Sequence, residues 1–134
     1  MKTVFVDTNV MLDVLLKNEG LWHDSLRIFQ LAEQKRIRAF VSASSMTDVF
    51  YVASKKLSLT EARQAIEKPL DLFGVVNVDS DDLRSALHIG INDFEDALQA
   101  HCAGKIKADA LITRDVKGFA GTGIAVVQPV DFQP

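Results

Sequence analysis

Cysteine and long apolar runs are scarce in this chain of 134 residues, and each scarcity excludes a class of protein. The only cysteine is Cys102, so no internal disulfide can form, and a reducing, cytoplasmic location is expected. No apolar run approaches the roughly 20 residues that a membrane-spanning helix needs. Asp7 interrupts the first run, Val4–Val6, too early for a signal peptide. We therefore expect a soluble protein with no membrane partner.

Positive charge is also scarce for a protein that would bind nucleic acid. The chain has 15 lysines and arginines against 18 aspartates and glutamates, which gives a net charge of −3. Nucleic-acid-binding proteins are more often basic. This balance does not exclude such a function, because binding depends on local patches and a metal ion in an acidic site reverses the local sign.

The order of apolar runs and helical stripes predicts the fold class. The length and the hydrophobic content of 48% predict one globular domain that spans residues 1–134. Short apolar runs alternate with helical stripes, which is typical of an α/β domain with a mostly parallel sheet. We predict six helices and five strands, the strands lying at residues 3–6, 39–41, 75–78, 110–113 and 124–127.

Caps and helix-breaking residues predict where several helices begin and end. Ser58 and Glu61 have the spacing of a capping box at the start of the fourth helix. Pro69 is expected to kink or stop that helix. The remaining expectations are a fifth helix over 79–89, a sixth over 93–103 and a poorly structured end at 129–134.

Four aspartates hold informative positions in this predicted order. Asp7 ends the first strand and Asp115 lies just past the fourth, and ligands of open α/β sheets bind beyond the carboxyl ends of strands. Asp48 lies in the first turns of the helix after the second strand. Asp96 lies in the first turn of the helix that leads into the fourth. With one cysteine and three histidines without ligand-like spacing, carboxylates are the remaining candidates for catalysis.

A cluster of carboxylates indicates a particular chemistry. Like charges in one pocket repel and raise each other's pKa, so the cluster is stable when a cation is bound. Hard oxygen ligands select Mg²⁺ or Mn²⁺. Such ions activate water and neutralise charge on a phosphodiester. The cluster therefore favours phosphoryl chemistry over the hydrolysis of peptides or esters.

Four segments resemble the motifs of one known family, the PIN-domain proteins. The opening motif is Val4–Val10, and Ser42–Asp48, Asp96–Leu98 and Thr113–Asp115 resemble the second, third and fourth motifs. Their order and separations also fit, so the resemblance covers nearly the whole chain. It implies a three-layer α/β/α fold with a five-stranded parallel sheet of order 3-2-1-4-5. It also implies divalent-metal-dependent cleavage of RNA, as in VapC-type toxins, which an antitoxin holds inactive and which commonly form homodimers.

The resemblance also implies roles for single residues. Asp7, Asp48, Asp96 and Asp115 would be the catalytic carboxylates, with Asp7, Asp96 and Asp115 binding Mg²⁺ or Mn²⁺. The second acidic position is commonly glutamate in this family, so the shorter Asp48 would lie roughly 1.5 Å farther back and could reach the metal through water. The supporting residues would be Asn9, which orders the first turn, Thr113, which hydrogen-bonds the fourth aspartate, and Asp93.

Structural readings of the same residues stay open. Asp7 and Asp93 could be helix caps, with Asp96 the capping-box partner of Asp93, while Asp48 could be a surface residue and Asp115 a turn former.

Of the basic residues, Arg114 and Lys117 are the nearest to the acidic positions, and we expect one of them to contact substrate phosphate. The remaining expectations place His101 and Cys102 in the core, and Trp22, Phe50 and Tyr51 on a possible dimer surface.

Three functional hypotheses follow. The first is a metal-dependent endoribonuclease, the toxin of a type II toxin–antitoxin pair, with RNA as substrate and an antitoxin as partner. The second is a catalytically inactive module with the same fold that binds nucleic acid or protein, which the acidic pI and Asp48 favour. The third, much weaker, is a phosphatase of the haloacid-dehalogenase class, which needs a second aspartate where this chain has Asn9.

Overall fold

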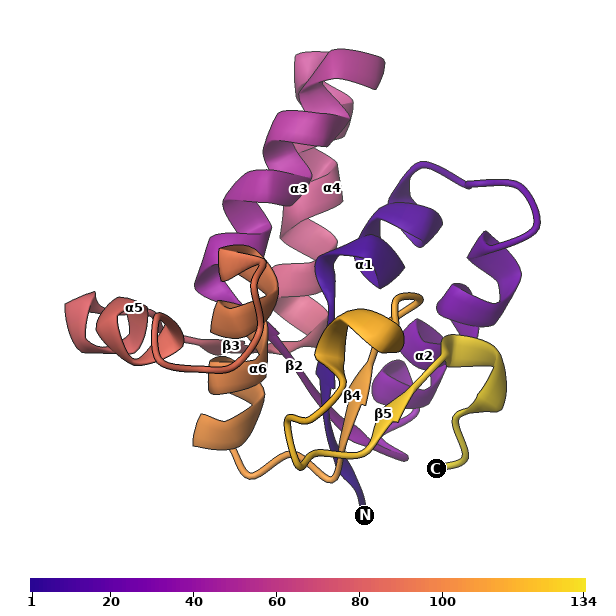
Figure 1. The fold of residues 1–134 in the computed structure, drawn as a ribbon. Helices are drawn as coiled ribbons and strands as arrows, with labels where there is room; N and C mark the ends of the chain where they lie inside the picture. The colour runs from indigo at the N-terminus through magenta and orange to yellow at the C-terminus, as the bar shows by residue number, and fades with distance from the viewer.

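The five strands form one sheet in which all neighbours are parallel (Figure 1). The computed structural model describes residues 1–134, and its strand order is β3-β2-β1-β4-β5. The predicted fold class and strand order are therefore confirmed. The strands are β1 Thr3–Val6, β2 Arg38–Ser42, β3 Gly74–Val76, β4 Ala110–Ile112 and β5 Val126–Val127.

Six α-helices cover the two faces of this sheet. Helices α1 and α2 and the α3–α4 pair lie on one face, and α5 and α6 lie on the other (Figure 1). None of them combines the length and the apolarity that crossing a membrane would require. The helices are α1 Thr8–Leu15, α2 Trp22–Glu33, α3 Ala43–Lys56, α4 Leu59–Leu72, α5 Ser80–Ala86 and α6 Phe94–Lys105, with 3₁₀ turns η1 Lys117–Phe119 and η2 Pro129–Asp131.

The central strand β1 divides the hydrophobic core into two layers. Val4 and Val6 point into the layer under α1, α2 and α3, while Phe5 points into the layer under α6. This alternation follows from the strand period of two residues. Because β1 is buried on both faces and pairs with β2 and β4, its carboxyl end lies at the middle of the sheet edge, where the chain can gather side chains from both halves.

Several predicted boundaries differ from the structure. The fifth helix ends at Ala86 rather than near Ile89, and the sixth continues through Gly104 to Lys105. Pro69 does not stop α4, which runs on to Leu72. Proline removes only the one hydrogen bond that its own nitrogen would donate to Ala65, and its carbonyl oxygen still accepts from the backbone N–H of Phe73.

The expectation of a poorly structured carboxyl end is wrong. Residues Pro129–Asp131 form η2, and Phe132 behind it is only 2% exposed and packs in the core layer of α1 and α2. Lys2 Nζ donates a hydrogen bond to the carbonyl oxygen of Gln133 at 2.9 Å. Burial of one phenyl ring thus anchors a segment whose prolines suggested disorder.

The placement of His101 in the core is also wrong. Its ring is half-buried, and Nε2 lies 2.8 Å from Oδ1 of Asp82 on α5, while Lys105 Nζ donates to Oδ2 of Asp82 at 2.9 Å. The backbone N–H of Asp79 also donates to Asp82, and this bond, followed by those from Lys105 and His101, holds the pKa of Asp82 well below its usual range. Polar contacts rather than apolar packing therefore join this part of α6 to α5. Cys102, by contrast, is fully buried as predicted.

Candidate active site

Asp7 is a buried carboxylate held by three hydrogen bonds at the sheet edge. It follows β1 directly, is 6% exposed and caps α1, since Oδ1 accepts a 2.8 Å hydrogen bond from the backbone N–H of Thr8. Gln99 Nε2 donates to the same oxygen at 3.0 Å, and Thr113 Oγ1 donates to Oδ2 at 2.8 Å. The capping role and a role in a site therefore coexist, because three donors fix the side chain at the sheet edge.

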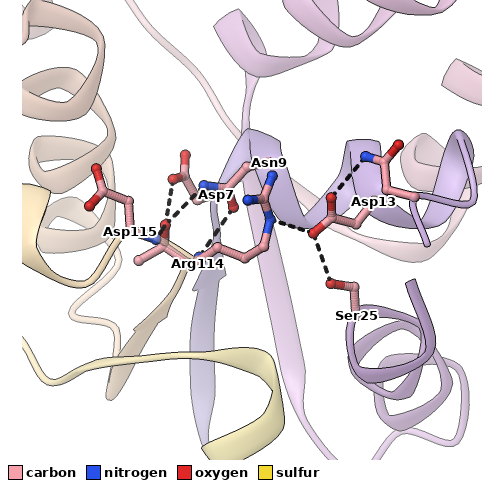
Figure 2. Close-up of polar contacts among 8 residues, drawn as sticks. Asp7, Asn9, Asp13, Ser25, Arg114 and Asp115 are labelled. Atoms are coloured by element: carbon pink, nitrogen blue, oxygen red, sulfur yellow. Dashed lines mark hydrogen bonds and ion pairs between the residues drawn. The ribbon is translucent and has the colours of Figure 1, made fainter. Parts of the chain in front are cut away.

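The hydroxyl of Thr113 joins the ends of β1 and β4 (Figure 2). Besides donating to Asp7, Thr113 Oγ1 accepts hydrogen bonds from Asn9 Nδ2 at 3.2 Å and from the backbone N–H of Asp115 at 3.1 Å. In this structure Thr113 thus contacts the side chain of Asp7 and only the backbone of Asp115. Asn9 is turned toward the end of β4, where its amide donates to Thr113, so the structure offers it no role as the acid or base of a phosphatase.

Asp96 shares a cleft of about 250 Å³ with Asp7, and the cleft is also lined by Asp93 and Glu95. Asp93 is the N-cap of α6 and accepts a 2.9 Å hydrogen bond from the backbone N–H of Asp96. The side chain of Asp96 is not used as a cap partner. Partial burial, followed by the charges of Asp93, Asp7 and Asp115, raises the pKa of Asp96 to about 6. Those three carboxylates are therefore electrostatic neighbours of Asp96.

Glu95 is an acidic residue of this cleft to which the sequence analysis gave no role. Partial burial raises its pKa to about 7, and the next largest causes are the charge and hydrogen bonding of the Asp48 side chain. Asp7 and Asp93 add smaller contributions. Asp48, half-buried on α3, thus faces Glu95 and does not line the cleft of Asp7 and Asp96. The sequence did offer a signal for Glu95, because it lies within one helical turn of Asp93 and Asp96.

Asp115 approaches the cleft from the side of η1. Its Oδ1 accepts a 3.2 Å hydrogen bond from the backbone N–H of Gly118. A Cβ atom added at Gly118 would lie 2.5 Å from Oδ2 of Asp115 and 3.3 Å from Oδ2 of Asp96. The two carboxylates therefore lie close to Gly118, and a side chain at this position would require the carboxylate of Asp115 to move.

These residues are the right kind of ligands for a hard divalent cation. They offer carboxylate oxygen alone, and the one thiol is unsuited to catalysis because burial raises the pKa of Cys102 to about 11. No three acidic, histidine or cysteine side chains are grouped tightly enough to form a coordination shell as they stand. Asp115 is exposed and Asp96 is half-exposed, so a rotation of these two side chains would change their distance from Asp7. The donor set fits Mg²⁺ or Mn²⁺ better than Zn²⁺, which most often takes histidine or cysteine ligands as well.

The buried side chain of Gln99 connects Asp7 to the β2–α3 junction. Gln99 is 1% exposed, and besides Asp7 its Nε2 donates to Ser45 Oγ at 2.9 Å, while Oε1 accepts from Ser42 Oγ at 2.7 Å. Ser42 and Ser45 belong to the β2–α3 junction that leads to Asp48. Gln99 was missed by the sequence analysis, although it is the one amide among the apolar residues of its helix face.

The two basic residues near the site differ in their surroundings. Arg114 Nε donates to Oδ2 of the buried Asp13 at 2.6 Å, so this arginine is already part of an ion pair. Lys117 is exposed at the start of η1 and makes no side-chain hydrogen bond. Trp22 and Phe50 are half-buried, and Tyr51 is 61% exposed, so only Tyr51 presents most of its ring to a possible partner.

The fold and the acidic edge define an α/β domain whose site is built from carboxylates. A family model described as PIN domain matches residues 3–117, and the chain belongs to this family. No curated protein matches the chain at the sequence level.

Several solved structures have folds similar to that of this chain. A chain in the DNA-bound VapBC structure from Salmonella typhimurium has 19% identity and a TM-score of 0.73, with 96% of this chain and 99% of that chain covered. A toxin–antitoxin complex from Klebsiella pneumoniae gives 23% identity and a TM-score of 0.69, with coverage of 96% and 99%. VapC20 of Mycobacterium tuberculosis, a toxin that cleaves the sarcin–ricin loop, gives 16% identity and a TM-score of 0.65, with coverage of 81% and 86%.

Proposed function

We propose that this protein is a divalent-metal-dependent endoribonuclease and the toxin of a type II toxin–antitoxin pair. The observation that carries the proposal is the meeting of Asp7, Asp96 and Asp115, from three distant segments, at the carboxyl edge of a PIN-domain sheet. Partial burial, followed by the charges of Asp93, Asp7 and Asp115, raises the pKa of Asp96, and a bound cation would favour its charged form. An inert module would have no need to maintain this unfavourable arrangement.

In the proposed site, Asp7, Asp96 and Asp115 would hold Mg²⁺ or Mn²⁺. The metal, when bound, supplies an activated water and neutralises charge on the phosphodiester. Gln99 and Thr113 orient Asp7 through hydrogen bonds to its two oxygens. Asp48 and Glu95 lie beside this set and can share a proton, which provides an acceptor or donor at the edge of the cleft. Arg114 and Lys117 are the candidates for contact with substrate phosphate.

The proposed partners are RNA, an antitoxin and a second copy of the chain. Support for the antitoxin is the likeness to chains from VapBC and other toxin–antitoxin complexes. Support for RNA is the likeness to VapC20, which cleaves the sarcin–ricin loop. The exposed ring of Tyr51 is available to a dimer, and the single buried cysteine suits the reducing cytoplasm.

Metal removal tests the enzymatic part of this proposal. Purified protein incubated with end-labelled single-stranded RNA and Mn²⁺ is expected to produce discrete fragments, which EDTA abolishes and added Mn²⁺ or Mg²⁺ restores. The test is a gel of the labelled products over time. Absence of cleavage on a diverse RNA pool, together with failure to bind Mn²⁺ in calorimetry, would instead identify a catalytically inactive PIN module.

Substitution of Gly118 by alanine tests the placement of Asp115. The new Cβ would lie 2.5 Å from Asp115 Oδ2, and the flexible carboxylate is expected to move aside while the fold is kept. A displacement of about 1 Å typically costs about 100-fold in rate, so a loss of that order in RNA cleavage is expected. Gly104→Ala is the matched control, because nothing lies within 4 Å of the added atom. Equal cleavage rates for both variants would contradict a role for Asp115.

A further inference from the structure

Asp13 is a fully buried carboxylate to which the proposed mechanism gives no role. It lies on α1, has 0% exposure and accepts three hydrogen bonds (Figure 2). The donors are Arg114 Nε at 2.6 Å, Asn18 Nδ2 at 3.0 Å and Ser25 Oγ at 3.5 Å. Burying a carboxylate costs free energy unless a positive partner compensates, and Arg114 is the only cation that contacts it.

The ion pair uses only part of the guanidinium. Arginine–carboxylate pairs are frequently bidentate, with two parallel N–H donors facing the two carboxylate oxygens. Here Arg114 contacts Asp13 through Nε alone, and neither terminal nitrogen has a hydrogen-bond partner in the protein. The arginine side chain is 38% exposed. Four N–H groups of the fork therefore remain free to bind another anion.

One face of α1 fixes Arg114 relative to the acidic site. Asn9 Oδ1 accepts a 3.4 Å hydrogen bond from the backbone N–H of Arg114, and Asp13, four residues later on the same helix face, holds its side chain. In Figure 2 the arginine side chain runs toward Asp13, and Asp115 lies on the other side of Asp7. The ion pair with Asp13 thus directs the guanidinium away from Asp115.

We propose that Asp13 is a positioning residue for RNA binding. It holds the guanidinium of Arg114 at the rim of the acidic site, where the two terminal nitrogens bind a phosphate next to the scissile one. Arginine suits this role because its planar fork can serve a carboxylate through Nε and a phosphate through the terminal nitrogens at once. The inference rests on the RNA-binding part of the proposed function.

A double-mutant cycle in RNA binding tests the inference. The full chain is compared as wild type, Asp13→Asn, Arg114→Met and the double variant, with Arg114→Lys as a fifth protein. The probe is a short fluorescein-labelled single-stranded RNA of random sequence, titrated with Ca²⁺ in place of Mn²⁺ over a range of salt concentrations, and a gel checks that the RNA stays intact. Thermal unfolding of each protein is measured in parallel, so that binding is compared only among folded proteins.

The expected result is a loss of binding that the two residues share. Arg114→Met should weaken binding by about tenfold and lower the slope of log K against log salt by about one. Asp13→Asn should weaken binding by about threefold, and the double variant should bind no worse than Arg114→Met. Arg114→Lys should melt close to wild type, because the charge next to Asp13 remains, but should bind RNA weakly, because the fork is lost.

Asp82→Asn is the matched control, since it also removes a buried carboxylate paired with a basic side chain, Lys105, but lies in the α5–α6 contact. Equal RNA binding by wild type, Arg114→Met and Asp13→Asn would overturn the inference, as would an equal loss in Asp82→Asn. RNA cleavage that requires Asp7 would still stand in that case. Conversely, Arg114-dependent binding without metal-dependent cleavage would leave this inference intact and refute the nuclease.

Discussion

Replacement of Asp7 by asparagine is expected to abolish metal-dependent RNA cleavage, with a loss of at least about 1,000-fold. The carboxylate is the one acidic group held by three hydrogen bonds at the centre of the sheet edge. Asparagine removes its charge, which is the property that a Mg²⁺ or Mn²⁺ ligand needs, and catalytic metals supply several kcal/mol of transition-state stabilisation. Initial rates on end-labelled RNA, with metal in excess, measure the effect.

The fold of the Asp7→Asn variant should persist, so that loss of activity can be assigned to chemistry. Asparagine is as good an N-cap as aspartate, and its carbonyl oxygen can still accept from the backbone N–H of Thr8. Its amide loses the bond with the hydroxyl of Thr113, because that oxygen has only two lone pairs and they already accept from Asn9 and Asp115, and we expect this to cost about 1–3 kcal/mol of stability. Asp71→Asn, an exposed position on α4, is the control for loss of one negative charge. Cleavage by Asp7→Asn at the control rate would rule out the proposed site.

Replacement of Gln99 by leucine is expected to be the most destabilising single change in the site. Leucine fills a similar volume but can neither donate to Asp7 and Ser45 nor accept from Ser42. Leaving a buried polar group without its partner costs about 1–3 kcal/mol, and more for a charged group. Because Ser42 and Ser45 can still bond each other, we expect a loss of about 3 kcal/mol rather than the full sum. Urea unfolding followed by circular dichroism measures it.

The control for this variant is Gln30→Leu, an exposed position on α2 that has no side-chain hydrogen bond. Its free energy of unfolding should stay within about 0.5 kcal/mol of wild type. A loss below about 1 kcal/mol for Gln99→Leu would mean that the network around Asp7 relaxes freely and that Gln99 does not organise the site.

Strand and helix order could be predicted because the signals are local. The buried run Thr3–Val6 ends abruptly at Asp7, and the stripe of α3 recurs at helical spacing. The strand order 3-2-1-4-5 came from the family resemblance, because the alternation of strands and helices leaves the order of strands in the sheet open. The boundaries of the elements were less predictable. Helix α4 continues past Pro69. At the other end of the chain, Phe132 orders the last residues through contacts with residues that are far away in sequence.

The site was predictable in part for the same reason. Motif positions located the aspartates, but no local signal shows which partner a buried side chain will find. Gln99 contacts Asp7 across 92 positions, and Arg114 contacts Asp13 across 101. The positive charge of Arg114 predicted a contact with substrate phosphate. It did not show that the carboxylate of Asp13 already binds this arginine. Such pairs depend on tertiary distance, which a single sequence does not record.

The position of β1 between β2 and β4 has a consequence for the protein during its synthesis. Asp7 is synthesised 106 residues before Thr113, which donates to its side chain, and the backbone N–H of Asp7 donates to the carbonyl oxygen of Ile112. Until those residues emerge, the amino-terminal carboxylate lacks its neighbours from β4 and η1, and the edge strand that completes the sheet has not yet been made. A nascent chain therefore carries Asp7 and Asp96 before Asp115 joins them, and the proposed site can assemble only after β4 and η1 have been made.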